Sequence, residues 1–197
     1  MADLLESLNG EHKEQVSPIG ALKFILERHI SNLDNWAINT KILIILHRSL
    51  QNKKVNRKII KDLKKNEHLL HPYSKKNPEN KYNIRMFMEI SKLYSIYLKY
   101  YMNACLKTDI FVKPRKGFSE EVRKLRMSDI LKNYEFFENL ATQIFQLFQH
   151  TNFCKQTRLF SNLIFMLLKD LLEIYRIYYT HITELLERFA SLDKKQA

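Results

Sequence analysis

The sequence contains few of the residues that break or reverse helices. Among its 197 residues there are three Gly and four Pro. Tight hairpins, phosphate-cradling loops and multi-stranded β folds all consume Gly, and no stretch keeps the alternation of a half-buried strand. The composition therefore predicts an all-α protein, and the length is sufficient for a single domain with a buried core.

Cysteines and long apolar runs are equally scarce. Cys105 and Cys154 are the two cysteines and give no disulfide framework, so a reduced intracellular protein is expected. The strongest uncharged apolar run, residues 159–168, is far shorter than the ~20 residues that span a bilayer. Residues 1–16 are too polar and acidic for a signal peptide. We expect a soluble chain.

No motif of a catalytic or metal site is present in the sequence. Gly10, Gly20 and Gly117 stand alone, so there is no Gly-rich phosphate loop, and neither a nucleophile elbow nor a kinase signature occurs. His68 and His71 have no carboxylate or thiol at a matching ligand spacing. We predict a non-enzymatic protein without a cofactor or a bound metal.

Apolar periodicity predicts seven or eight helices joined by short polar loops. The main helices are expected at residues 18–30, 34–51, 55–65, 82–107 and 128–148. Ser128 is the expected N-cap of the last of these. The pattern at residues 155–192 is longer than one ordinary globular helix, so a break near Tyr179 is expected. Residues 111–127 contain Pro114, Gly117 and six basic residues, and are expected to form a mobile loop.

Residues 34–51 have the pattern of a helix that is buried on both sides. Asp34 or Asn35 can cap it, because a short side-chain oxygen accepts from free N–H groups of the first turn. Most of the positions that follow are apolar and leave little surface for water. His47, on this helix, is therefore expected to be a hydrogen-bonded packing residue and not a catalyst.

Positive charge is concentrated in residues 41–81, which hold twelve Lys/Arg against three Asp/Glu. The formal net charge is +12, and residues 53–65 alone hold seven Lys/Arg against one Asp. A basic face can serve solvation only, but such clustering favours an anionic partner: a membrane surface, a nucleic acid or an acidic peptide. Nucleic-acid binders often expose aromatics for base stacking. The tyrosines of residues 82–107 follow the core period instead, so a membrane surface is favoured and no nucleic acid is expected.

Three segments resemble one known family in the same order along the chain. Asn35-Trp36 followed by residues 41–50 resembles the N-W-V-V-x-x-K-x-L-x-x-x-H-x-x-L helix of ANTH domains. Residues 82–101 are similar to the family's Y-D-x-S-x-F-I-R-x-Y-x-x-Y-L helix. Residues 165–189 resemble its F-M-L-L-F-K-D…Y…I-I-N-L-L-E-K-Y-F helix pair. The chain thus resembles the ANTH/ENTH domains of clathrin-assembly adaptor proteins over about residues 18–195.

This resemblance implies a right-handed superhelix of about seven to eight stacked helices that binds phosphoinositides. The implied module is a cytoplasmic, peripheral membrane adaptor of clathrin-coated pits or vesicles, with clathrin and other coat adaptors as partners. Residues 1–197 are expected to form one ANTH/ENTH-like domain without the family's first lipid-motif segment and its last helices. The K-A-T…K-x-K-[HY] lipid motif has no counterpart in residues 1–17, where Lys13 is the one Lys or Arg.

Candidate headgroup ligands come partly from the resemblance and partly from the basic cluster. In the related epsin-type ENTH domain, basic residues eight positions before the Trp and five after it contact the headgroup, and Arg28 and Lys41 occupy these positions here. The cationic helix adds a diffuse attraction. The candidate lipid-binding residues are Arg28, Lys41, Lys53, Lys54, Arg57, Lys58 and Lys61. A VHS-like or polymerase-tail-binding peptide scaffold stays open as an alternative, as does a basic nucleic-acid binder.

Overall fold

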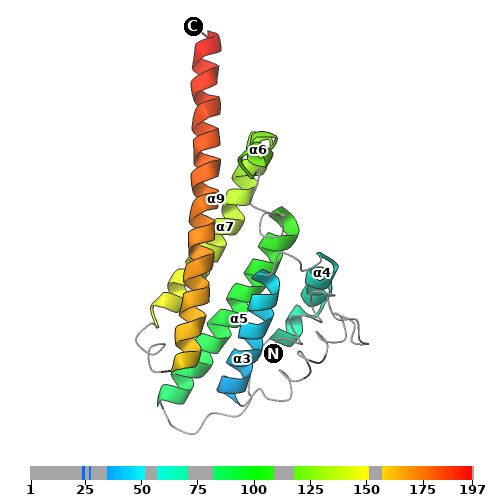
Figure 1. Cartoon of the computed structure of the whole chain (residues 1–197), viewed down its shortest axis with the longest axis vertical. Coiled ribbons are helices and arrows are strands. Elements are labelled where there is room, and N and C mark those ends of the chain that lie inside the picture. The colour runs from blue at the N-terminus through cyan, green and yellow to red at the C-terminus, as the bar shows by residue number, and fades with distance from the viewer. Residues whose placement is uncertain are drawn as a thin grey trace.

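The computed structural model describes residues 24, 27, 35–51, 57–70, 82–108, 118–150 and 157–196 of the chain (Figure 1). Its elements are α3 (Trp36–Gln51), α4 (Arg57–Lys65), the 3-10 turn η1 (Glu67–Leu70), α5 (Tyr82–Thr108), α6 (Phe118–Arg123), α7 (Met127–Phe148) and α9 (Arg158–Gln196). All the regular elements in these ranges are helical, which confirms the predicted all-α class. The predicted helices at 34–51, 55–65 and 82–107 are present as α3, α4 and α5.

The helices are arranged around α5. It packs against α3, α4 and α7, and α9 packs against α7 and α3 (Figure 1). The tyrosine stripe of α5 lies inside, with Tyr94 and Tyr97 fully buried and Tyr101 2% exposed. At the start of α3, the ring of Trp36 lies 4.5 Å from that of Phe87 and 5.6 Å from that of Phe160, which joins α3, α5 and α9.

The buried character predicted for α3 is confirmed. The Asn35 side-chain oxygen accepts from the backbone N–H groups of Ala37 and Ile38, at 3.1 and 3.2 Å, and so caps the helix. Nine of the sixteen residues of α3 are buried, including Leu43 at 0% and Leu46 at 1% exposure. Each such leucine contributes about 2 to 5 kcal/mol relative to alanine. The sequence of α3 therefore positions it firmly between its neighbours.

The break expected near Tyr179 is wrong, because α9 runs without interruption for 39 residues. No Gly or Pro lies within it, and the hydroxyls of Thr180 and Thr183 donate to the carbonyls of Arg176 and Tyr179, four residues back, at 3.0 and 2.8 Å. A helix of this length extends about 58 Å. Its C-terminal part rises beyond the other helices in Figure 1. The average length of globular helices therefore failed to predict the end of α9, because this segment contains no residue that would stop a helix.

Two expectations for residues 111–128 also need correction. The segment is not loop throughout, because it contains α6, whose Val122 is 1% exposed. Ser128 is not the N-cap of α7: the helix begins at Met127, and Arg126 is the extended residue before it, without a side-chain cap. Instead, Arg126 Nε donates to Asp129 Oδ2 at 2.9 Å. This ion pair lowers the pKa of Asp129, and the helix dipole favours an acid in the first turn.

Candidate functional site

The exposed cations of α3 form the first part of the candidate site. Most of α3 is buried, but Lys41 and Arg48 are exposed. They are seven residues apart, so they lie two turns apart on one face of the helix. Lys41 was a candidate headgroup ligand from the sequence, whereas Arg48 was not. The seven-residue spacing was a signal that could have identified Arg48.

The second part is the cationic helix α4. Ile60 and Leu63 are buried against the core at 1% and 2% exposure, and Lys61 is exposed. Lys65 forms an i,i+3 ion pair with Asp62 at 3.7 Å, so part of the positive charge of α4 is balanced within the helix. The amphipathic pattern predicted for this helix therefore places Lys61 on the surface.

Lys99 of α5, which was not among the candidate ligands, lies near the charged end of α4. Lys64 forms an ion pair with Glu67 of η1. Both charges act on Lys99 of α5. Partial burial lowers the pKa of Lys99, the negative charge of Glu67 raises it, and the positive charge of Lys64 lowers it further. Lys99 is thus part of the α4–η1 charge cluster, which only the folded chain brings together.

The structure places two of the predicted headgroup ligands. Lys41 and Lys61 are both exposed, on different helices that pack against α5. Arg28, Lys53 and Lys54 lie outside the described residues. The side chains of Arg57 and Lys58 also lie outside the description, although their backbone belongs to α4.

A buried polar network lies behind the Lys41–Arg48 face. His47 Nε2 lies 2.6 Å from Asp170 Oδ2, and His47 Nδ1 lies 2.8 Å from the Tyr94 hydroxyl. Asp170 also accepts from Gln51 Nε2 at 2.6 Å and from the Tyr97 hydroxyl at 2.5 Å. With the Nε2–H tautomer, His47 donates to Asp170 and accepts from Tyr94. The hydrogen-bonded packing role predicted for His47 is confirmed.

This network resembles a catalytic His–Asp pair only in composition. His47 is 0% and Asp170 4% exposed, so in this conformation no substrate reaches them. Burial raises the pKa of Tyr94 and Tyr97 well above the usual value, and the Asp170 carboxylate adds to the effect. The tyrosines therefore remain neutral hydrogen-bond donors. The network stabilises the contact between α3, α5 and α9.

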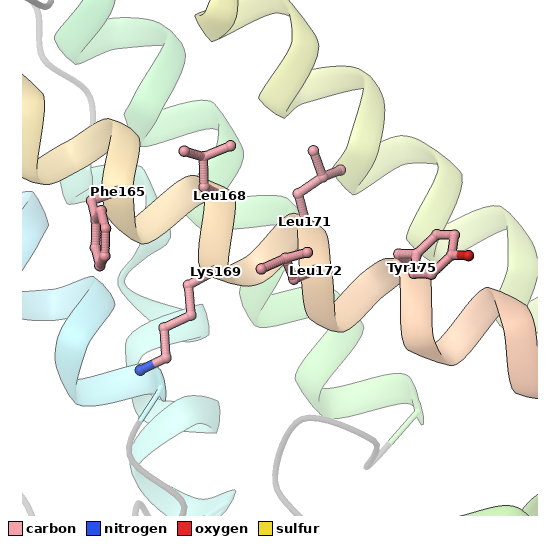
Figure 2. A pocket seen from close by; sticks show the side chains of 6 residues that line it. All are labelled: Phe165, Leu168, Lys169, Leu171, Leu172 and Tyr175. Carbon is pink, nitrogen blue, oxygen red and sulfur yellow. The ribbon is translucent and has the colours of Figure 1, made fainter.

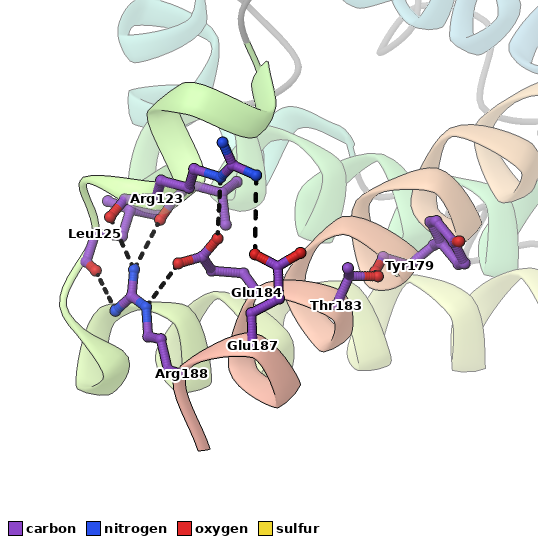
Figure 3. A network of polar contacts seen from close by, with 8 residues as sticks. Arg123, Leu125, Tyr179, Thr183, Glu184, Glu187 and Arg188 are labelled. Atoms are coloured by element: carbon purple, nitrogen blue, oxygen red, sulfur yellow. Dashed lines mark hydrogen bonds and ion pairs between the residues drawn. The ribbon is translucent and has the colours of Figure 1, made fainter. Parts of the chain in front are cut away.

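A second polar network fastens the α6–α7 corner to α9 (Figure 3). Arg188 Nε donates to Glu184 at 2.7 Å, and its terminal nitrogens donate to the carbonyls of Leu125 and Arg123 at 2.8 and 2.9 Å. The Arg123 guanidinium in turn lies 3.6 Å from Glu184 and 3.8 Å from Glu187. Arg188 thus satisfies backbone carbonyls at the end of a short helix, which explains why this corner is structured.

Neither a metal site nor a membrane span is found in the part of the chain that the structure describes. No group of three or more His, Cys, Asp or Glu side chains there is arranged to share a metal ion. Among the described helices, none has both the length and the hydropathy needed to cross a bilayer. His71 and the side chain of His68 lie outside the description.

Comparison with known proteins identifies the family. Neither the curated proteins nor the solved structures give a match to this chain. The family model of the ANTH domain matches residues 15–197, which is most of the sequence and includes every helix from α3 to α9. The chain therefore belongs to the ANTH domain family.

Proposed function

We propose that this domain is a phosphoinositide-binding, peripheral membrane adaptor module that acts in clathrin-mediated vesicle trafficking. Membership of the ANTH family supports this proposal, because the family resemblance implies both headgroup binding and coat partners. The proposed localisation is the cytoplasmic surface of clathrin-coated pits or vesicles, and the proposed partners are clathrin and other coat adaptors. We also propose that the layered helices form a right-handed superhelix.

The exposed pair of Lys41 and Arg48 on a buried helix is the observation that carries the proposal. A helix that is held fixed loses less conformational freedom when its cationic side chains bind a phosphate, which favours affinity. The core contacts of α3 and the His47–Asp170 network hold this helix. A bisphosphorylated headgroup bound between Lys41 and Arg48 would gain charge-assisted hydrogen bonds, and the Arg guanidinium suits a phosphate especially well.

The remaining cations would act at longer range. Arg28 is proposed as a direct headgroup ligand by its position relative to Trp36, whereas Lys53, Lys54, Arg57, Lys58 and Lys61 supply diffuse attraction to an anionic leaflet. Each cation near the surface contributes about 1 kcal/mol, or roughly a fivefold change in affinity. This attraction is screened over about 8 to 10 Å at physiological ionic strength. Membrane binding should accordingly weaken as salt is added.

Liposome sedimentation tests the proposal. Vesicles with phosphatidylinositol 4,5-bisphosphate are compared with vesicles whose charge is matched by phosphatidylserine. We expect tighter binding to the inositide vesicles, and a loss of at least about tenfold for a Lys41→Glu/Arg48→Glu variant. Lys124→Glu/Lys132→Glu, at two exposed cations, changes the net charge by the same amount and is the matched control, which should bind normally.

Three outcomes contradict the proposal. Equal binding to both kinds of anionic vesicle would leave only unspecific charge attraction. Tighter binding to RNA than to either vesicle would favour the nucleic-acid alternative. Capture of an acidic peptide without any vesicle binding would favour a VHS-like scaffold. Each result can be obtained with the same set of variants.

A further inference from the structure

The outward face of α9 carries an uninterrupted apolar stripe. Its eight side chains are between 43% and 74% exposed: Phe165, Leu168, Leu172, Tyr175, Tyr179, Ile182, Leu186 and Phe189. Successive members are alternately three and four residues apart, which is the heptad spacing by which one helix packs along another. This face of α9 therefore has the pattern of a helix–helix contact.

The same helix carries a second stripe that faces the core. Its members repeat with the same spacing and are all buried: Phe160, Leu163, Leu167, Asp170, Ile174, Ile177, His181 and Glu184. One stripe thus packs against α3 and α7, and the other faces solvent. A helix with apolar stripes on two sides is typically covered on both. Among the helices that the structure describes, none covers the outer stripe.

The outer stripe reads nearly the same from either end. From residue 165 the residue types are Phe, Leu, Leu, Tyr, Tyr, Ile, Leu and Phe. The centre of this palindrome lies between Tyr175 and Tyr179. A two-fold axis through that point would place Phe165 opposite Phe189 of a second copy, and Leu172 opposite Ile182. At each pair of facing positions, the two side chains then have similar size and polarity, as an isologous contact requires.

One half of the stripe also borders a hollow (Figure 2). The hollow has a volume of about 570 Å³ and is lined by Phe165, Leu168, Lys169, Leu171, Leu172 and Tyr175. Its lining is almost wholly apolar, with one ammonium group at the edge. In the antiparallel arrangement this hollow would receive Ile182, Leu186 and Phe189 of the second copy. The hollow therefore lies along the half of the stripe that would face the C-terminal half of α9 in the second copy.

We infer that two copies of this chain associate antiparallel through the outer stripe of α9. A large apolar side chain presents about 150 to 250 Å² when fully exposed, so these eight offer on the order of 900 Å². A stable interface buries about 800 Å² on each partner, and the largest apolar patch of a typical monomer is about 300 to 600 Å². Arg176, the cation closest to the axis, lies 3.7 Å from Glu173, which reduces repulsion between the copies.

Analytical ultracentrifugation of the 197-residue chain tests the association, which does not depend on the proposed function. We expect the mass to rise with concentration from 23.7 kDa toward twice that value. Leu172→Glu should abolish this rise, because two carboxylates would be buried in the contact. Leu131→Glu on α7 is the matched control, since Leu131 is 57% and Leu172 63% exposed. This control should dimerise like the unmodified chain.

A cross-link tests the antiparallel direction. In a Cys154→Ser background, the double variant Leu172→Cys/Ile182→Cys should form disulfide-linked dimers under mild oxidation. Within one copy these positions are ten residues, or about 15 Å, apart along α9, so an internal bridge is excluded. Leu172→Cys alone should cross-link poorly, because its counterpart in the second copy is residue 182. Efficient dimer formation by this single variant would show a parallel contact and overturn the proposed direction.

Three results would overturn the association itself. The first is a chain that remains monomeric at every soluble concentration. The second is a Leu172→Glu variant that dimerises as strongly as Leu131→Glu. The third is a monomer whose binding to phosphatidylcholine vesicles is lost in Leu172→Glu, which would assign the stripe to a lipid surface. Circular dichroism of each variant reports whether the helices remain intact.

Discussion

His47 and Asp170 are 123 residues apart in the chain, yet His47 Nε2 lies 2.6 Å from Asp170 Oδ2. This contact joins α3 to α9 across the tyrosines of α5. The helix that carries Lys41 and Arg48 on its outer face is thus held from behind by a buried polar network. The network thus supports the face of α3 that we propose binds the headgroup.

Removal of the Asp170 carboxylate should strongly destabilise the fold. Asp170→Ala leaves His47, Gln51 and Tyr97 without their shared acceptor, and a buried polar group without a partner is costly. We expect the free energy of unfolding in urea to fall by about 3 to 5 kcal/mol. Glu187→Ala, whose side chain is 57% exposed on the same helix, should lower it by less than about 1 kcal/mol. Equal effects would contradict a supporting role for the network.

His181 should make stability depend on pH in the mildly acidic range. Burial lowers the pKa of His181 from 6.5 to about 4. Between these values the unfolded chain binds a proton that the folded chain does not, so stability is present above pH 6.5 and is lost as the pH falls toward 4. The loss should reach about 2 to 3 kcal/mol.

Unfolding in urea at several pH values checks this prediction. His181→Gln removes the titrating group, so the variant should lose less stability than the unmodified chain between pH 6.5 and 4. His150→Gln, at the end of α7, should keep the original dependence. A His181→Gln profile that runs parallel to that of the unmodified chain would mean that another group titrates in this range.

The Arg188 contacts should control the mobility of the α6–α7 corner. Arg188→Ala removes the donors to the carbonyls of Leu125 and Arg123, so the amides of residues 122–126 should exchange faster with deuterium. Global stability should fall by only about 1 to 2 kcal/mol. Arg176→Ala removes an exposed arginine of the same helix and should leave exchange at this corner unchanged. Unchanged protection in Arg188→Ala would show that apolar contacts, such as those of Val122, hold the corner.

Local signals in the sequence were sufficient for much of the fold. The Asn35 cap and the apolar run after it predicted α3, and the tyrosine period predicted α5, because both patterns arise within one helix. The sequence motif that begins at Asn35-Trp36 also identified the ANTH domain. The three- and four-residue spacing of the outer stripe of α9 is also present in the sequence. Only the packing of α9 shows that this stripe faces outward.

Features that depend on distant contacts could not be predicted. Helix α6 has only six residues and follows Pro114 and Gly117, so its own sequence resembles a loop. Arg188, more than sixty residues later, contributes the contacts that hold it. The sequence contained these residues without showing which of them meet.

The most direct test of the central claim is an NMR titration of the chain with a soluble inositol headgroup phosphorylated at positions 4 and 5. We predict saturable shifts of the backbone amides of Lys41 and Arg48, with none at Lys132 on α7. These shifts should disappear in Lys41→Glu/Arg48→Glu, while the spectrum of the core remains unchanged. A titration that leaves Lys41 and Arg48 unmoved, or that inorganic phosphate reproduces at the same concentration, would contradict headgroup recognition by α3.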